Sequence, residues 1–268
     1  MPELPEVETV ATGVHERIHG ERIQSVWLSR YKEPFKTPPA EMAEALTGQR
    51  IERVHRVGKH IVFDLTNTQW IVHLGMTGRL LVSSSAVPVP PHTHAILSLD
   101  SGRELRFVDA RRFGRLALHP VSGAQAFRGP GHEPLTISAT GFRILFRNRK
   151  LSIKAALLNQ TLLHGVGNIY ADESLFHAGI RPTRMAGRLT RERLDRLHAA
   201  LQSILRKAIE LGGSSVSDYV DADGVAGFFQ LEHRVYLRTG QPCLVCGTPI
   251  RRIVLAGRGT HYCPHCQH

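Results

Sequence analysis

The sequence has few cysteines, few lysines and no long hydrophobic run. All four cysteines lie within the last 26 of the 268 residues. A disulfide framework would spread cysteines along the chain, so this distribution argues against one and favours a metal site. No stretch approaches the roughly 18 apolar residues of a membrane span, and the N-terminus lacks the hydrophobic core of a secretion signal. We therefore expect a soluble, intracellular protein with no membrane contact.

The scarcity of lysine contrasts with a strongly basic character. Only six of the 34 basic residues are lysines, and the formal net charge is +11 with a pI near 10.1. Such a charge predicts an anionic partner. The length allows two domains, or two domains and a small module.

The hydrophobic pattern changes along the chain from alternating to helical. A helical apolar face close to the N-terminus is followed by short alternating segments, which indicate an antiparallel β-sandwich. The glycine- and proline-rich stretch 122–134 marks a domain boundary. Beyond it, an apolar stripe from Leu194 to Ala208 predicts a helix that ends at Gly212-Gly213. The alternating segments are 22–30, 50–56, 60–65, 69–74, 79–83, 94–99, 103–108 and 115–118.

The cysteines form two pairs, Cys243 with Cys246 and Cys263 with Cys266, and 16 residues separate the pairs. This spacing is typical of two zinc knuckles that close one tetrahedral site. A redox pair is the alternative, but two pairs in one short tail argue against it. Four thiolates leave no open position on the metal, so we predict one structural zinc ion that folds a small ribbon.

A β-hairpin is predicted between the two cysteine pairs, at Ile253–Thr260, with Arg258 at its tip. Glycines on both sides of Arg258 would let the backbone approach a ligand closely. Arg258 is either an exposed turn residue or a phosphate contact. The basic character of the chain favours the contact.

The sequence begins, at residues 1–6, with MPELPE. Removal of Met1 would leave Pro2 with a free secondary amine. An α-amino group has a pKa of about 7.7–8.0, so roughly a tenth of it is unprotonated at neutral pH. Pro2 is therefore a candidate nucleophile, with Glu3 or Glu6 as general acid. Proline and acidic residues also suit the first turn of a helix, and these residues alone favour that interpretation.

A tight glycine turn, Gly165-Val166-Gly167, precedes a helix that we expect to run to about Ala178. Asn168 is placed as its N-cap. Free N–H groups at a helix N-terminus bind phosphate, whereas a plain turn between helices is the alternative. The strand that precedes such a turn in a dinucleotide fold is missing, which argues against a nucleotide cofactor.

Together, these motifs resemble the formamidopyrimidine-DNA glycosylase family, bacterial enzymes that excise oxidised purines. The resemblance covers almost the whole chain, including both termini. It rests on Pro2–Thr9, His73–Gly78, Asp109–Gly114, Gly165–Ala171 and the four-cysteine ribbon. One departure is His132, which stands where the family has proline. It alters an interdomain segment and leaves the chemistry untouched.

The resemblance implies a multidomain α+β fold with DNA in the cleft between domains. A helix and an antiparallel β-sandwich would form the catalytic domain over 1–121, followed by a linker over 122–135. A helical DNA-binding domain with a helix–two-turn–helix motif would span 136–232, and a zinc-finger hairpin 233–268. The stretch 218–230 corresponds to the family's lesion-capping loop.

For catalysis, the resemblance assigns four residues and reverses the interpretation of the N-terminus. Pro2 attacks C1′ of the damaged nucleoside, and Glu3 protonates the sugar as the base leaves. Lys59 assists base loss and β-elimination, and Arg258 serves δ-elimination and phosphate binding. The implied function is a bifunctional DNA glycosylase and AP lyase of base excision repair, acting on 8-oxoguanine and formamidopyrimidines.

Extrusion of a damaged base leaves a gap in the duplex. The resemblance implies that Met76, Arg111 and Phe113 fill it. Arg111 has only hydrogen-bond donors, which suits the acceptor-rich edge of an orphaned cytosine, so lesions opposite C are expected to be favoured. Without the resemblance, Met76 and Phe113 would be predicted to lie in the core and Arg111 to be a surface charge.

Five further residues match DNA contacts of the family: His92, Arg149, Asn168, His73 and Lys154. Taken singly, each would be expected to be a solvated side chain. The implied partner is double-stranded DNA with oxidised bases. The protein would act as a monomer in the bacterial cytoplasm, associated with the nucleoid.

Two other functions fit part of the sequence. Endonuclease VIII-type enzymes act on oxidised pyrimidines, but Leu4 and the pair Arg111 and Phe113 argue against that branch. A non-catalytic zinc-ribbon protein that binds damaged DNA would share the charge, the turn and the zinc site. A covalent link through Pro2 distinguishes the enzyme from this binding protein.

Overall fold

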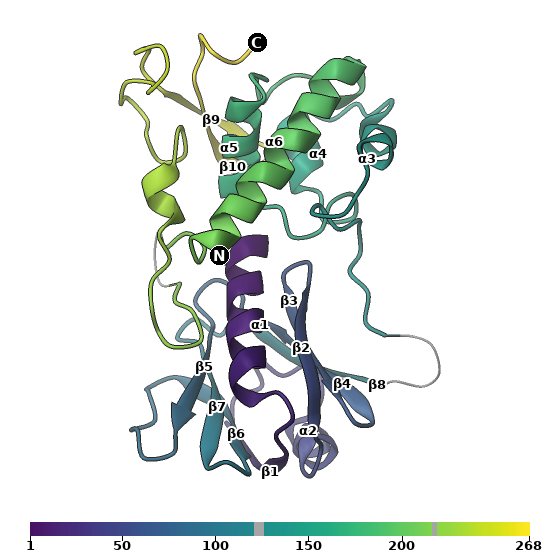
Figure 1. Ribbon diagram of the computed structural model, residues 1–268, viewed down its shortest axis with the longest axis vertical. Coiled ribbons are helices and arrows are strands. Elements are labelled where there is room, and N and C mark those ends of the chain that lie inside the picture. Colours follow the sequence, from purple (N-terminus) through teal and green to yellow (C-terminus); the bar gives the residue numbers. More distant parts are fainter. Residues whose placement is uncertain (121–125, 216–218) are drawn as a thin grey trace. The chain divides into compact units, whose positions relative to one another are not determined.

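The computed structural model describes residues 1–120, 126–215 and 219–268. The chain divides into two compact units (Figure 1). Unit 1 comprises Met1–Arg128 and Leu211–Phe228, and unit 2 comprises Gly129–Glu210 and Phe229–His268. Part of the predicted linker (122–125) and the first residue of the predicted capping loop (Asp218) lie outside the described residues.

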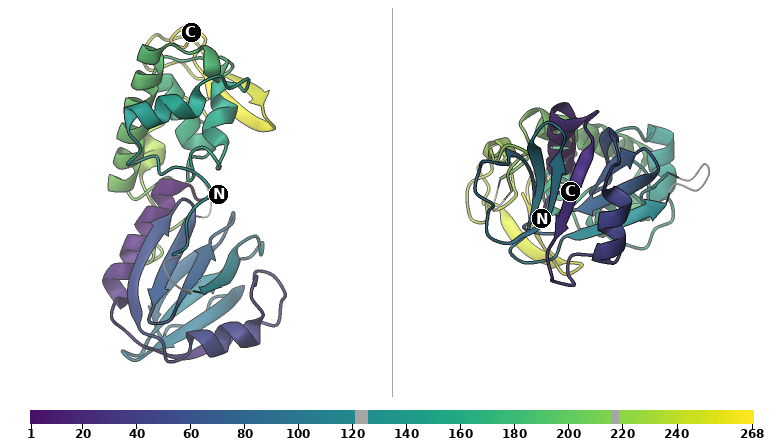
Figure 2. Two further views of the ribbon diagram at one scale, coloured as in Figure 1. Left: turned by 90° about the vertical axis from the view of Figure 1, so that its right-hand side faces the viewer. Right: turned by 90° about the horizontal axis from the view of Figure 1, so that it is seen from below.

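Unit 1 is the predicted antiparallel β-sandwich, with two four-stranded sheets of strand order β1-β6-β7-β5 and β2-β3-β4-β8. Figure 2 shows these strands in two layers with helix α1 along one side. The elements are α1 (Leu4–Ile18), β1 (Ile23–Leu28), α2 (Pro39–Leu46), β2 (Ile51–Val57), β3 (His60–Leu65), β4 (Thr68–His73), β5 (Arg79–Ser84), β6 (Thr93–Leu99), β7 (Arg103–Val108) and β8 (Arg115–Pro120).

Helix α1 packs against both sheets of the sandwich. Its apolar face includes Val7, Val10 and Val14, which are buried in one core with side chains of both sheets. The helix contacts β2 and β3 of one sheet and β5 of the other. Burial of each aliphatic side chain contributes about 1.5–3 kcal/mol, so the core holds the start of the chain in place.

The segment Leu211–Phe228 lies in unit 1, whereas the sequence-based boundaries placed it in the helical domain over 136–232. Its contacts explain the difference. Ser214 N donates a 2.7 Å hydrogen bond to Glu6 Oε1, and Tyr219 is buried in the core of the sandwich. These partners are far apart in sequence, so local periodicity carries no information about them.

Unit 2 combines helices with a two-stranded hairpin. As predicted, the apolar stripe of α6 is buried, and the helix is followed by Gly212 and Gly213, with φ of +72° and +81°. Helix α5 contacts α4, α6 and β10, so the hairpin is attached to the helices. The elements are α3 (Ala139–Phe146), α4 (Ile153–Leu158), α5 (Asn168–His177), η1 (Ala186–Arg188), α6 (Arg191–Glu210), η2 (Phe229–Glu232), β9 (Arg251–Leu255) and β10 (Arg258–Tyr262).

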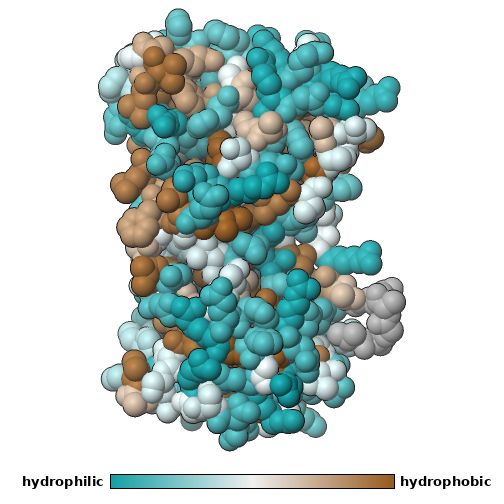
Figure 3. All heavy atoms as spheres, in the orientation of Figure 1, coloured by the Kyte–Doolittle hydropathy of each residue, from teal (hydrophilic) through white to brown (hydrophobic). Residues whose placement is uncertain are grey.

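The surface of each unit is mainly hydrophilic on the face that Figure 3 shows. Within the described residues, no helix has both the length and the apolar character needed to cross a membrane. Some large apolar side chains are nevertheless exposed, including Met76 at 40% and Phe113 at 47%. Both were predicted to enter DNA, and both lie on loops of unit 1.

Candidate active site

The candidate nucleophile lies at the start of α1. Pro2 is buried, and Met1 before it is 47% exposed. Glu3 is the N-cap of α1 and forms a capping box with Glu6, whose Oε2 accepts a 2.8 Å hydrogen bond from Glu3 N. The helix-start interpretation and the catalytic one are therefore compatible, because a capped helix holds Pro2 and Glu3 in defined positions.

Glu6, which the sequence left open as a general acid, has a structural role. Its two carboxylate oxygens accept hydrogen bonds from Glu3 N and Ser214 N. A Cβ at Gly213 would lie 2.9 Å from Glu6 Cγ, so glycine permits this approach. Tyr219 donates from its hydroxyl to Glu6 O at 3.3 Å, and burial raises the pKa of this phenol. Sequence reasoning missed this contact between α1 and the segment 211–228.

A group of nitrogen-bearing side chains surrounds the turn between β2 and β3, where Lys59 lies with 9% exposure. The rings of His60 and His73 are 5.0 Å apart. Burial lowers the pKa of His73 to about 4, with further lowering by His60, Lys59 and Arg115. His73 Nδ1 accepts a 3.1 Å hydrogen bond from Gly75 N. In the DNA-free protein His73 is therefore uncharged at neutral pH, with Nδ1 as an acceptor.

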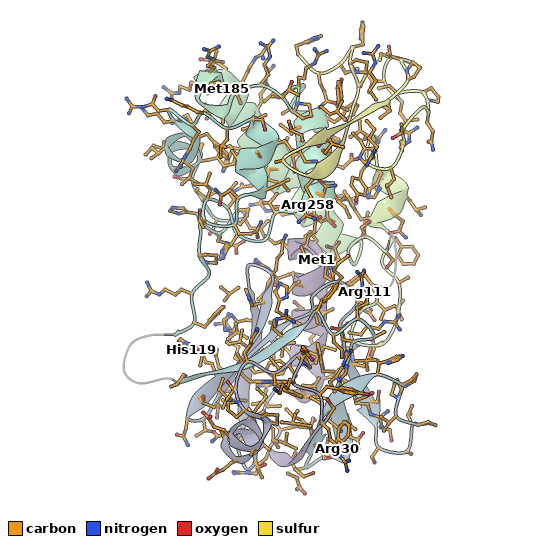
Figure 4. All side chains as sticks on the ribbon, turned by 180° about the vertical axis from the view of Figure 1, so that it is seen from behind. Met1, Arg30, Arg111, His119, Met185 and Arg258 are labelled. Atoms are coloured by element: carbon orange, nitrogen blue, oxygen red, sulfur yellow. The ribbon has the colours of Figure 1, made fainter. Side chains whose placement is uncertain are left out.

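The three residues predicted to fill the gap in DNA lie on two loops of unit 1. Met76 is on the loop between β4 and β5, and Arg111 and Phe113 are on the loop between β7 and β8, where Figure 4 labels Arg111. The guanidinium of Arg111 lies 4.8 Å from the centroid of the Phe113 ring, a cation–π contact. Both apolar side chains are exposed, so the alternative that they are core residues is wrong.

Two predicted DNA contacts are exposed, one in each unit. His92, just before β6, has a φ of +64°. Arg149 follows α3, and its Nε donates a 3.0 Å hydrogen bond to Leu145 O. Both side chains are accessible to a ligand.

Lys154 differs from the prediction. Its side chain is fully buried in unit 2 and forms an ion pair with Asp172, which is fully buried too. A fully buried ammonium group cannot contact a DNA phosphate, so the predicted direct contact is wrong. Sequence alone does not distinguish a solvated lysine from one that pairs with a carboxylate 18 residues away.

The glycine turn before α5 also differs in detail. The N-cap of α5 is Gly167, and Asn168 is the first helical residue. Asn168 Nδ2 donates a 2.9 Å hydrogen bond to Gly259 O of the hairpin. Gln160, which sequence reasoning missed, closes the turn by accepting from Gly165 N at 2.9 Å and donating to Val166 O at 2.8 Å.

The hairpin of β9 and β10 turns at Ala256 and Gly257, with φ of 49° and 70°. Two positive φ values are characteristic of the tight turns of two-residue hairpins. Arg258 follows the turn as the first residue of β10, where it pairs with Leu255 and is exposed. It is thus one position beyond the predicted tip.

The four cysteine sulfurs lie within 4.8 Å of one another. Cys246 and Cys263 have Sγ atoms 3.5 Å apart, and those of Cys243 and Cys266 are 3.9 Å apart. Zinc–sulfur bonds of about 2.3 Å in a tetrahedron place sulfurs about 3.8 Å apart. The cysteines therefore fit a structural zinc ion.

Three family models match the chain. They are the formamidopyrimidine-DNA glycosylase N-terminal domain over residues 1–116, the formamidopyrimidine-DNA glycosylase H2TH domain over 130–220, and a zinc finger found in FPG and IleRS over 240–268. Relatives match over the full length. Formamidopyrimidine-DNA glycosylase of Solibacter usitatus is 46% identical to this chain, and the match covers 100% of this chain and 99% of the relative. That of Listeria innocua is 43% identical, with 100% of both chains covered.

Solved structures agree in fold. A Lactococcus lactis FPG mutant in complex with DNA containing Fapy-dG has a TM-score of 0.91 and 36% identity, with 100% of both chains covered. MutM (FPG) of Thermus thermophilus has a TM-score of 0.87 and 41% identity, covering 99% of this chain and 98% of its own.

The sandwich, the helical turn, the zinc finger and these matches define a DNA glycosylase of base excision repair. More narrowly, the chain belongs to the formamidopyrimidine-DNA glycosylase family. The predicted family, fold class, glycosylase activity and zinc site are thereby confirmed. The roles of single residues stay predictions.

Proposed function

We propose that the chain is a bifunctional DNA glycosylase and AP lyase that works through the N-terminal amine of Pro2. After removal of Met1, the lone pair of this nitrogen attacks C1′ of the damaged nucleoside. The glycosidic bond breaks, the base leaves and takes up a proton, and the opened sugar is held as an iminium ion. This cation withdraws electrons, so loss of a C2′ proton expels the 3′ phosphate in β-elimination.

Glu3 and Lys59 support this step. Glu3 lies beside Pro2 and donates the proton that the sugar oxygen takes up as the base departs. Lys59 assists departure of the base and the β-elimination. Its place at the turn between β2 and β3, in the same unit as Pro2, supports the assignment.

Arg258 completes the lyase reaction by holding the phosphate that leaves in δ-elimination. Its exposure at the start of β10 supports this role. Zinc, held by the four cysteines, supplies no chemistry to the reaction and stabilises the fold of the hairpin that carries Arg258.

The proposed partner is double-stranded DNA with an oxidised purine opposite C. Related structures hold DNA with Fapy-dG, an abasic site, or carbocyclic 8-oxo-G. We assign Met76, Arg111 and Phe113 to the gap left by the extruded base, with Arg111 donating to the orphaned cytosine. His92, Arg149 and Asn168 would bind the DNA, and His73 would add a further contact. The protein would act as a monomer at the bacterial nucleoid.

The observation that carries this proposal is the position of Pro2. It directly precedes the capped start of α1, within the residues that match the glycosylase N-terminal domain. Met1 is exposed, which suits its removal by a processing enzyme.

Borohydride trapping on an 8-oxoguanine:C duplex tests the proposal. Wild-type protein whose intact mass shows loss of Met1 should form a covalent protein–DNA adduct, because borohydride reduces the iminium ion. Pro2→Gly should lower trapping by about 100-fold or more while binding persists. Pro5→Gly makes the same exchange at the start of α1 and should still be trapped. Absence of any adduct with the trimmed wild-type protein would exclude the mechanism.

A thymine-glycol duplex separates this activity from that of an endonuclease VIII-type enzyme. Excision of 8-oxoguanine should be at least about tenfold faster than excision of thymine glycol, since Arg111 and Phe113 suit the purine branch. The opposite ranking would assign the chain to oxidised pyrimidines.

A further inference from the structure

Asp109 lies at the end of β7, where the loop that carries Arg111 and Phe113 begins. Its side chain is fully buried. A buried carboxylate is costly unless hydrogen-bond donors surround it, so its partners show what it holds. Three donors from two different loops converge on it.

One carboxylate oxygen joins the two loops. Asp109 Oδ1 accepts a 2.6 Å hydrogen bond from the Thr77 hydroxyl, one residue beyond Met76. The same oxygen lies 3.3 Å from Arg111 N, which also donates to it. The side chain of Thr77, next to Met76, and the backbone of Arg111 are therefore held by a single atom.

The other oxygen fixes the far end of the second loop. Asp109 Oδ2 accepts a 2.8 Å hydrogen bond from Gly114 N, immediately after Phe113. The carboxylate thus spans Arg111 to Gly114 and closes the loop around Phe113. Such a closed loop leaves the exposed ring little backbone freedom.

The main chain of Asp109 is also hydrogen-bonded to His92, another predicted DNA contact. Asp109 N donates a 3.0 Å hydrogen bond to His92 O. Asp109 O accepts from His94 Nε2 at 2.9 Å, so His94 Nδ1 is left to accept from the Ser29 hydroxyl at 3.1 Å. His94, which supports the backbone of Asp109, is therefore itself fixed by a buried hydrogen bond to Ser29.

Backbone contact between the two loops is direct as well. A Cβ at Gly75, where φ is +65°, would lie 2.5 Å from Gly114 N and 2.5 Å from the Phe113 carbonyl carbon. A Cβ at Gly114 would lie 2.5 Å from Phe107 Cζ and 3.1 Å from Asp109 Oδ2. Glycine is needed at both positions for the loops to meet around the carboxylate.

We propose that Asp109 is a positioning residue that holds Met76, Arg111 and Phe113 in one arrangement before DNA binds. It reaches the loop of Met76 through the Thr77 hydroxyl, and it binds the loop of Arg111 and Phe113 directly through Arg111 N and Gly114 N. This inference rests on the proposed gap-filling role of these three residues. Side chains that are already ordered lose less conformational entropy on insertion, so their fixed arrangement favours base extrusion. Thr77 Oγ1, Arg111 N and Gly114 N all donate to the Asp109 carboxylate. The side-chain amide of Asp109→Asn would place its own N–H donor against one of these donors.

The first test needs no activity. Amide hydrogen exchange in DNA-free protein reports how firmly the loops 74–78 and 109–114 are held. Thr77→Val removes the hydroxyl at constant shape, and Asp109→Asn disturbs its acceptor. Both should speed exchange in both loops by about tenfold or more. Thr77→Ser keeps the hydroxyl and should restore wild-type exchange. Unchanged exchange in Thr77→Val would overturn the proposal.

The second test measures what the arrangement does. With 8-oxoguanine opposite C, Thr77→Val and Asp109→Asn should raise KM and slow excision by about tenfold. The preference for C over A opposite the lesion should shrink, because Arg111 is no longer fixed. Cleavage of a preformed abasic site in single-stranded DNA should change less than about twofold, since no base is extruded there. Thr77→Ser should again restore wild-type values.

Thr68→Val, which removes a β4 hydroxyl that donates to His119 O of β8, is the matched control and should leave both tests unchanged. An equal loss on single-stranded abasic DNA, or an unchanged C-to-A ratio, would show that Asp109 does not act through the gap-filling residues. If wild-type protein forms no borohydride adduct, the proposed function fails, while the exchange result still decides whether Asp109 holds the two loops.

Discussion

Lys154 is buried in the interior of unit 2, where its ammonium group forms an ion pair with Asp172. Neither side chain is exposed. The other carboxylate oxygen, Asp172 Oδ2, accepts from His261 N at 2.9 Å and lies 3.1 Å from His261 Nδ1. Lys154 therefore neutralises the carboxylate that attaches β10 to α5.

Replacement of Lys154 should destabilise unit 2. Lys154→Met leaves the buried Asp172 without its cation, and breaking a buried pair costs about 3–5 kcal/mol. Urea unfolding followed by circular dichroism measures the change. Lys207→Met removes an exposed lysine that pairs with Glu210 at 3.5 Å, and it should change stability by less than about 1 kcal/mol. Equal effects of the two variants would contradict the buried-pair argument.

His73 should make the stability of unit 1 depend on pH. Burial lowers its pKa from 6.5 to about 4 in the folded unit. Between these values the unfolded chain binds a proton that the folded unit does not, so stability is complete above about pH 6.5 and falls towards about pH 4. The whole effect is at most roughly 3 kcal/mol.

Tryptophan fluorescence measures this effect, because Trp27 and Trp70, the two tryptophans of the chain, both lie in unit 1. Urea unfolding at about pH 5 and about pH 7.5 should differ for the wild type. His73→Asn keeps an acceptor for Gly75 N and removes the titrating ring, so the difference should shrink. A difference that survives in His73→Asn would assign the pH dependence to other groups.

The hairpin of β9 and β10 depends on contacts outside itself. It has only two strands, and an isolated two-stranded hairpin is marginally stable in water. The cysteine cluster holds one end, and two hydrogen bonds join β10 to α5. Asn168 Nδ2 donates to Gly259 O, and His261 N donates to Asp172 Oδ2. Zinc and the contacts with α5 therefore both hold the hairpin that carries Arg258.

Removal of zinc should loosen the hairpin and leave unit 1 folded. In zinc-free protein, amide exchange over 251–262 should rise by about tenfold or more, because the thiolates repel one another without the cation. Tryptophan emission should not change, since both tryptophans are in unit 1. Affinity for lesion DNA should fall. Unchanged affinity in protein with verified zinc loss would count against a role of the hairpin in binding.

The charge of the complete chain, formally +11, belongs to a protein that binds a polyanion. It is carried mainly by arginine, whose planar group suits phosphate better than the ammonium of lysine. The proposed contacts lie in both units, so DNA affinity should depend on the whole chain.

Salt titration of DNA binding measures the number of phosphates neutralised. Each contact contributes about 0.9 to the slope of log K against log salt, and we expect a slope between about −3 and −6. Arg258→Ala should reduce it by about 0.9. Arg22→Ala, at an exposed position whose Nη1 bonds to Gly48 O, should leave the slope unchanged. A flat response of the wild type would exclude binding through phosphates.

The strands, the long helix and the zinc site follow from local patterns. The alternation over 95–99 indicates a strand with one buried face, and the stripe of α6 indicates a helix with one buried face. The cysteine spacing reports a metal because the chemistry of four thiolates is the same in any fold. The family resemblance added candidate residues that these patterns do not reveal.

Only the tertiary structure decided the environment of single polar residues. Lys154 is buried because Asp172 faces it, and Asn168 bonds to Gly259, which is 91 residues away in sequence. The segment Leu211–Phe228 joins the sandwich through Glu6 and Tyr219. Spacing along a chain records periodicity within an element, whereas burial and hydrogen bonding of a side chain depend on residues that folding brings to it.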